Sequence, residues 1–217
     1  MTPRMQDKIL VVVLILSNII VYYLTSSLVS EDMLYNDMSE RFGSDIAMNA
    51  IERRSDVNFN FLKYGLQTIW ITFKILAIIT IMTTGLNAFQ LKFSFSQVAK
   101  AAILPLFIFL LPDMAKLIWF SFINPNYEMQ ELNDFPQFAV SDILINLDLT
   151  SKTSFAGRLF NIVTIPSLLF CYFFAQNILT MQDKRSSLPY QASFISYFVV
   201  ISALRLLQLS FTSIVSP

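Results

Sequence analysis

Five stretches of this chain are long and apolar enough for an α-helix to cross a membrane, which requires ~20 residues for ~30 Å of hydrocarbon. They comprise about residues 9–29, 66–89, 101–123, 158–179 and 190–211. Over the whole chain 55% of the residues are hydrophobic and 14% are charged, whereas a soluble domain usually carries about 25% charged residues. A water-soluble core cannot bury that much apolar surface. The sequence therefore predicts an all-α fold, a polytopic membrane bundle of about five transmembrane helices.

Arg4 and Lys8 precede the first stretch, an arrangement that also occurs in secretory signal peptides. The apolar run is long and no small-residue cleavage site follows it, so we expect a retained span, with cleavage as the alternative. No internal repeat or low-complexity linker divides the chain. We therefore predict one membrane domain over residues 1–217.

The polar segments between the stretches differ in charge, which predicts the orientation of the chain. The short segments 1–8, 90–100 and 181–189 carry more lysine and arginine than carboxylate, so we expect them in the cytoplasm. Segments 30–60 and 124–156 are longer and hold twelve carboxylates, although they also contain Arg41, Arg53, Arg54 and Lys152. We expect these two segments to be outer loops, with the N-terminus in the cytoplasm and the C-terminus outside the cell membrane.

The first outer segment has a helical pattern, because apolar residues recur every four positions at Leu34, Met38, Phe42, Ile46 and Ala50. The polar face of this stripe is acidic, which disfavours binding to anionic lipid. We expect it to pack against the protein's own outer face or against a partner. In the second outer segment, one or two half-buried helical turns are predicted after two prolines, from the apolar residues Val140, Ile143, Leu144 and Leu147.

Four charged residues interrupt the predicted spans, at Lys74, Asp113, Lys116 and Arg205. A charge inside a membrane costs several kcal/mol unless it is paired or hydrated. Asp113, Arg205 and Lys74 would lie at a similar depth, ~20–25 Å from the cytoplasmic ends of their helices. We expect Asp113 to pair with Arg205 or Lys74. Two interpretations remain open: the cations reach the outer headgroups and the cluster is structural, or the cluster binds an ion, a proton or a lipid headgroup.

Three prolines, Pro105, Pro112 and Pro166, lie in predicted spans and predict helix kinks. Kinks of this kind expose backbone carbonyls in some transporters, but prolines are common in membrane helices without such a role.

Several function classes are disfavoured by composition. Histidine is absent, the formal net charge is zero, and the single cysteine, Cys171, lies in an apolar run. Motifs for nucleophilic serine chemistry, phosphate-binding loops and metal sites do not occur. We therefore expect a protein that is not an enzyme, without a metal site or cofactor, and without nucleic acid as a partner.

Two segments resemble those of Yip-family (Ypt-interacting protein) membrane proteins. In TGLNAFQLKFSFSQVAKAAILPLFIFLLP, residues 84–112, a span ends, a short polar connector follows, and the next span has an early proline. In INLDLTSKTSFAGRLFNIVTIPSLLF, residues 145–170, a short polar turn introduces a further span. The resemblance covers about residues 60–212, although the family usually has glycines where this chain has Gln90, Leu91, Val163 and Thr164.

This resemblance implies a small helical bundle that acts through partners. Eukaryotic members have a long cytoplasmic N-terminus, and eight residues precede the first predicted span here, so a bacterial inner membrane is the expected setting. The sequence therefore predicts a non-enzymatic membrane scaffold or accessory subunit, with a membrane protein or a second copy as partner and the acidic outer segments as docking surfaces. The alternative is a component of a transporter or channel with a polar site around Asp113 and Arg205.

Overall fold

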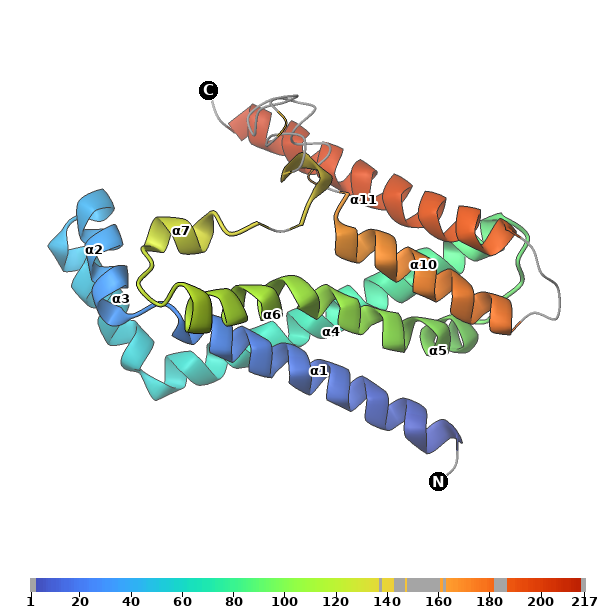
Figure 1. The fold of residues 1–217 in the computed structure, drawn as a ribbon, viewed down its shortest axis with the longest axis horizontal. Coiled ribbons are helices and arrows are strands. Elements are labelled where there is room, and N and C mark those ends of the chain that lie inside the picture. The colour runs from blue at the N-terminus through green and yellow to red at the C-terminus, as the bar shows by residue number, and fades with distance from the viewer. Residues whose placement is uncertain are drawn as a thin grey trace. The chain divides into compact units, whose positions relative to one another are not determined.

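The computed structural model describes residues 3–136, 138–142, 147, 161, 163–181 and 187–215, and of residues 3–7 and 203–215 it describes the backbone alone. Within these ranges the chain is helical from α1 to α11 (Figure 1). An isolated antiparallel bridge joins Ala139 to Thr164. The predicted all-helical fold is confirmed for this part of the chain.

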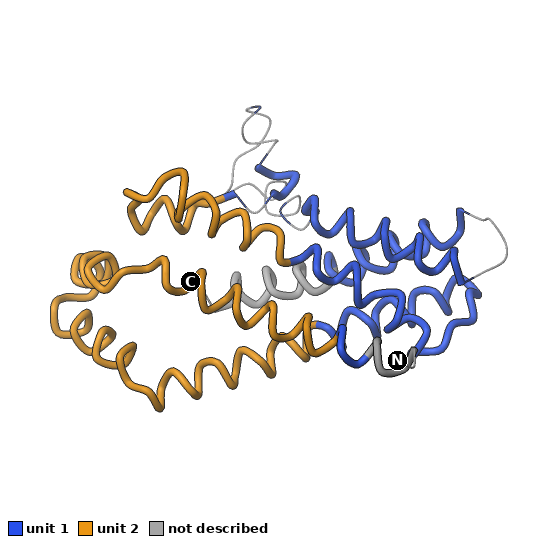
Figure 2. The backbone as a smooth tube through the Cα atoms, turned by 60° about the horizontal axis from the view of Figure 1, so that its bottom comes forward, with its two compact units in different colours: residues 1–10, 75–109, 136–217 blue, residues 11–74, 110–135 orange. Residues whose placement is uncertain are grey.

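The chain forms two compact units, which are coloured separately in Figure 2. Unit 1 comprises residues 1–10, 75–109 and 136–217, and unit 2 comprises residues 11–74 and 110–135. Both units are built from helical stretches that continue from one unit into the other.

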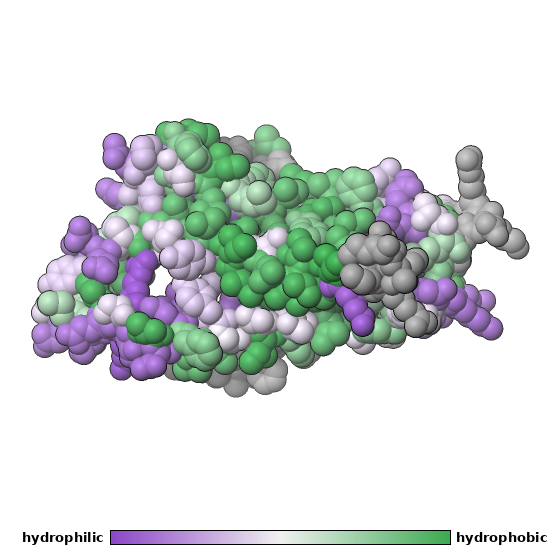
Figure 3. Space-filling view, turned by 90° about the horizontal axis from the view of Figure 1, so that it is seen from below, coloured by the Kyte–Doolittle hydropathy of each residue, from purple (hydrophilic) through white to green (hydrophobic). Residues whose placement is uncertain are grey.

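Three helices are long and apolar enough to cross a membrane. The first is the part of α1 (Pro3–Ser27) from Lys8 to Ser27, and the second is α4 (Val57–Ala88). The third is the continuous segment Phe95–Ile123. It consists of α5 (Phe95–Leu106), the 3-10 helix η1 (Phe107–Leu110), α6 (Leu111–Ile118) and the π-helix η2 (Trp119–Ile123). Hydrophobic residues form broad continuous patches on the face shown in Figure 3.

The last two helices are apolar, and α10 (Ile165–Thr180) has 16 residues, about 24 Å of helix. It begins later than the predicted fourth span, whose residues 158–160 lie outside the described part of the chain. Helix α11 (Leu188–Val215) covers the predicted fifth span, and its apolar section with described side chains is Leu188–Ser202.

The first predicted outer segment contains two helices rather than one continuous stripe. Helix α2 (Glu31–Phe42) and helix α3 (Ser44–Ser55) pack against each other and are separated by Gly43, whose φ of 93° is strained for any residue with a side chain. The predicted stripe is therefore wrong, because the turn at Gly43 gives its two halves different axes. Phe42 and Ile46 are exposed, and the buried residue is Ala47. Helix α4 begins at Val57, nine residues before the predicted second span.

Unit 1 has an aromatic core where α10 packs against α5 and α11. Phe170 and Phe174 are fully buried, and the Phe170 ring lies 5.1 Å from Phe109 and 5.7 Å from Tyr197 between centroids. Both α5 and α10 begin with a capping box, in which the N-cap side chain and the side chain three residues later satisfy each other's backbone N–H groups. Capping fixes where these helices start and therefore which residues face the core.

In unit 2, tyrosines near the C-terminal end of α1 and near the start of α4 contact each other. The rings of Tyr22 and Tyr64 lie 6.3 Å apart, and the ammonium of Lys63 lies 5.4 Å from the centre of the Tyr22 ring. The second outer segment contributes the short helix α7 (Met129–Asn133) to this unit. Of the turns predicted after the second proline, Val140 is helical, and Ile143 and Leu144 lie outside the described residues.

Candidate functional site

Three of the four residues in the predicted charge cluster belong to unit 2. Lys74 on α4 and Asp113 on α6 are exposed, and Lys116 on α6 is half-buried. The ammonium of Lys74 lies 5.4 Å from the centre of the Trp70 ring, a cation–π contact within α4. Arg205 belongs to α11 in unit 1, and its side chain lies outside the described part of the structure.

Asp113 interacts electrostatically with Lys116 and Lys74. In the described part of the structure, the carboxylate oxygens of Asp113 and the ammonium of Lys74 are farther apart than 4.0 Å, the limit for an ion pair. The expected pairing with Lys74 is therefore a longer-range attraction here, and pairing with Arg205 stays a prediction.

The three prolines have different structural roles. Pro105 is buried inside α5 and cannot donate a hydrogen bond to the carbonyl of Ala101, because it has no N–H. The side chain of Asn177, on α10, donates to that carbonyl instead, at 2.8 Å. This bond replaces the missing backbone bond and joins α10 to α5.

Pro112 and Pro166 are both the second residue of a helix. Because α10 follows extended backbone, the absent N–H of Pro166 has no helical partner in any case. Pro112 lies where η1 passes into α6, within the long segment Phe95–Ile123. Pro166 begins α10, so the predicted kink at Pro166 is wrong. The reason is that α10 starts seven residues after the predicted start of the fourth span.

The end of α1 is capped by residues that come from far along the sequence. Its last turn has no basic residue, and Arg54 at the end of α3 donates to the carbonyls of Ser26 and Val29, at 2.9 Å and 2.6 Å. The hydroxyl of Tyr127 donates to the carbonyl of Leu28. Arg54 therefore serves as a distant C-cap for α1, which gives one cation of the first outer segment a structural role.

Tyr127 is held in an aromatic environment that keeps it protonated. Its ring lies 4.6 Å from that of Phe120, which is buried. Burial raises the pKa of Tyr127 above its ordinary value, so the phenol remains a hydrogen-bond donor up to a higher pH than an exposed tyrosine does.

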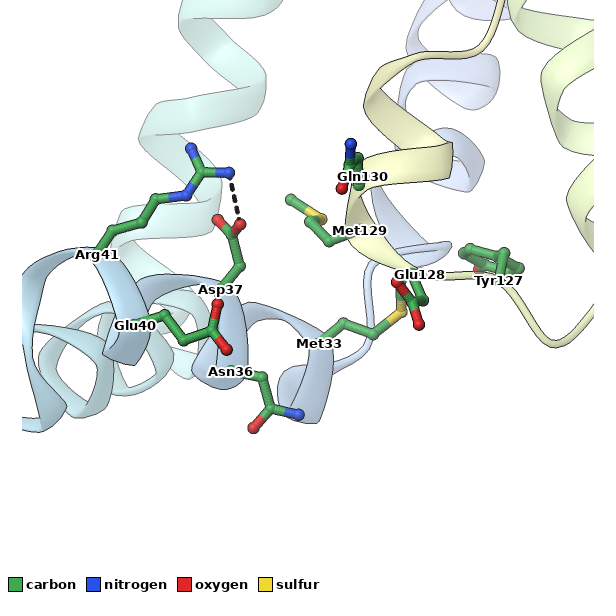
Figure 4. A pocket seen from close by; sticks show the side chains of 9 residues that line it. All are labelled: Met33, Asn36, Asp37, Glu40, Arg41, Tyr127, Glu128, Met129 and Gln130. Atoms are coloured by element: carbon green, nitrogen blue, oxygen red, sulfur yellow. Dashed lines mark ion pairs between the residues drawn. The ribbon is translucent and has the colours of Figure 1, made fainter.

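A pocket of about 460 Å³ lies between α2 and the segment that leads into α7 (Figure 4). Met33 extends from α2 toward α7, and Met129 extends from α7 toward α2. The remaining lining residues are mostly polar and comprise Asn36, Asp37, Glu40, Arg41, Tyr127, Glu128 and Gln130. The two walls come from the two acidic outer segments, which are about ninety residues apart in the sequence. We call α2, α3 and α7 the helical platform.

The pocket has an excess of negative charge. Asp37 forms an ion pair with Arg41 at 2.7 Å, one helical turn away (Figure 4). Three carboxylates, of Asp37, Glu40 and Glu128, against one guanidinium leave two negative charges. The Glu128 carboxylate also caps α7, since it accepts from the backbone N–H of Glu131. These groups can bind a cationic group through charge and hydrogen bonds, and the methionines can contact its apolar part.

Sequence reasoning did not identify Arg54, Tyr127 or the pocket. The one local signal was that α1 ends without a glycine or a basic residue, which leaves its last carbonyls without a local cap. Among the described residues, no group of three or more potential ligands that could hold a metal ion is found. No protein-family model, curated protein or solved structure matches this chain.

Proposed function

We propose that this protein is a non-enzymatic membrane scaffold or accessory subunit that binds a partner protein through the helical platform. The observation that carries the proposal is the pocket between α2 and α7. Its walls come from two segments that are distant in sequence, and Arg54 and Tyr127 tie both segments to the end of α1. A prearranged platform of this kind suits binding, because little order has to be gained when a partner docks.

The charge of the pocket specifies the partner's surface. Two uncompensated carboxylates favour a partner that presents lysine or arginine, and the methionine side chains favour the aliphatic part of such a residue. Asp37 already binds a guanidinium in this way, since Arg41 lies against it.

Five membrane crossings are part of the proposal. The lengths of the first three apolar helices support three of them, and the apolar helices α10 and α11 would supply the other two. The cytoplasmic N-terminus, the outer C-terminus and a bacterial inner membrane follow from the charge distribution and from the Yip-family resemblance. In a Cys171→Ser background, a cysteine at Asp45 should react with an impermeant reagent in intact cells and a cysteine at Lys92 should not. The reverse pattern would contradict the orientation.

The partner is tested by purification of the full chain in mild detergent, followed by mass spectrometry of the proteins that co-elute. We expect one companion at a fixed ratio with the wild type, and at least tenfold less of it with the Glu40→Gln, Glu128→Gln double variant. Glutamine preserves the cap at residue 128, and Glu52→Gln on α3 is the matched control, since Glu52 does not line the pocket. Equal recovery with the double variant, or no companion at a fixed ratio, would refute the proposal.

The alternative of a transporter component rests on Asp113, a carboxylate in an apolar helix whose charge interacts with two lysines. Such a site needs a path for water. A cysteine at position 113 should then react with a small water-soluble thiol reagent in the membrane, and a scaffold predicts no reaction.

A further inference from the structure

Two residues of the charge cluster, Lys74 and Asp113, lie on helix faces that are otherwise apolar and exposed. On α4, Lys74 is exposed beside Phe73 and Leu76, which are 60% and 49% exposed. On α6, Asp113 is exposed between the exposed residues Leu111 and Met114. In a membrane, a charged side chain usually faces the interior of a bundle. These residues instead lie on surfaces suited to lipid.

Both lysines have a tryptophan one helical turn away. The chain contains two tryptophans, Trp70 and Trp119, and they are 51% and 44% exposed. Trp70 precedes Lys74 by four residues, and Trp119 follows Lys116 by three. Helix α4 starts near the helical platform, and the helical segment that contains α6 ends near it (Figure 1). Each tryptophan therefore lies on the platform side of its lysine.

The side chain of Lys74 extends toward the platform. Its ammonium lies over the ring of Trp70, one turn nearer the start of α4. Lysine and tryptophan together are typical of the level at which lipid headgroups meet the hydrocarbon. This arrangement places the ammonium groups where a phosphate oxygen can reach them.

The charges of the cluster do not balance within unit 2. Asp113 interacts electrostatically with both Lys116 and Lys74, so two positive charges oppose one negative charge. A counterion can balance the remaining positive charge, and a phosphodiester carries one negative charge. A headgroup phosphate also accepts several hydrogen bonds, which suits two ammonium donors.

We propose that Lys74 and Lys116 bind the phosphodiester of an anionic phospholipid in the leaflet nearest the helical platform, and that Asp113 positions the two ammonium groups and limits their attraction. Zwitterionic lipid is disfavoured because its own cation competes for the phosphate. The proposal rests on the membrane-spanning character of α4 and of the segment Phe95–Ile123, and it is independent of a protein partner.

The two tryptophans make a direct test possible. The full chain is reconstituted in vesicles of phosphatidylcholine with a minor fraction of phosphatidylglycerol, and bromine is placed in the acyl chains of one lipid or the other. Bromine quenches tryptophan fluorescence on contact, so quenching reports which lipid lies beside Trp70 and Trp119. We expect quenching by brominated phosphatidylglycerol to exceed its mole fraction, with a preference that falls about fivefold for each lysine changed to glutamine.

Three further variants separate binding from misfolding. Lys74→Arg with Lys116→Arg keeps both charges and should keep the preference. Asp113→Asn removes the opposing charge and should increase the preference, a gain that an unfolded protein cannot produce. Lys92→Gln, in the connector before α5, is the matched control and should have no effect. Quenching by each lipid in proportion to its mole fraction in the wild type would overturn the proposal, as would a preference that survives the double glutamine change.

Discussion

The hydrogen bond between Asn177 and Ala101 provides the sharpest test of the fold. Pro105 removes the helical partner of the Ala101 carbonyl, and the Asn177 side chain replaces it from α10 at 2.8 Å. We propose the substitution Asn177→Leu, which keeps a similar volume and removes the donor. An unpaired carbonyl in an apolar environment is destabilising, so the loss should exceed that of an ordinary hydrogen bond.

The magnitude follows from the two contributions. Hydrogen bonds between membrane helices contribute about 0.6 kcal/mol on average and up to about 1.7 kcal/mol. A buried acceptor that is left without a partner costs about 1–3 kcal/mol. We therefore expect Asn177→Leu to lower the free energy of unfolding by about 1–2 kcal/mol, a factor of about 5–30 in the unfolding equilibrium.

The assay is reversible unfolding in mixed micelles with increasing denaturing detergent, followed by tryptophan fluorescence. The control is a double-mutant cycle with Pro105→Ala, which restores an N–H that can donate to Ala101. In that background, Asn177→Leu should lose most of its effect. An equal loss in both backgrounds would show that Asn177 stabilises the protein in another way, and the reasoning would be wrong.

Three further predictions use the same unfolding assay. Gly85→Ala should destabilise by about 1–3 kcal/mol, because an added Cβ would clash with the side chain of Ser196, and Ser196→Gly should restore part of the loss. Arg54→Met should destabilise by about 2 kcal/mol through loss of two charged hydrogen bonds to the end of α1, and a loss no larger than that of Arg53→Met would contradict the capping role. Tyr127→Phe should destabilise by about 1 kcal/mol. Burial raises the pKa of Tyr127, so the contribution of its hydroxyl to the free energy of unfolding should be fully present below pH 10.0, the ordinary value. This contribution should be lost as the pH rises through the folded-state pKa. A stability difference between the wild type and the Phe variant that shrinks at lower pH would refute this.

The helical character of the chain and the approximate positions of its long apolar helices were predictable from hydropathy alone. An apolar run of sufficient length has few alternatives to a helix in a membrane, since every backbone polar group must be paired internally. The starts of α5 and α10 have local causes, in the capping boxes of Ser94 with Gln97 and of Thr164 with Ser167. The start of α4 at Val57 was missed because its first turns contain polar residues, which hydropathy does not recognise as part of a span.

The stripe across the first outer segment shows where periodicity is insufficient. Residues spaced by four predicted one helix from Leu34 to Ala50, but Gly43 divides that range into α2 and α3. One glycine with a positive φ is enough to end the first helix and start a second one in a new direction. A repeat along the sequence carries no information about such a change of helix axis.

Sequence by itself determined that the described chain is helical, that it contains apolar helices long enough to cross a membrane, and that its charges gather in short connectors and in two acidic segments. Only the tertiary structure decided which distant groups meet: Arg54 and Tyr127 at the end of α1, Asn177 at the carbonyl freed by Pro105, and α2 with α7 around the pocket. The physical reason is that helix formation depends on hydrogen bonds between residues four apart, whereas a cap or a pocket depends on where helices cross. That crossing is set by the packing of whole faces, such as the aromatic core around Phe170, and no local pattern encodes it.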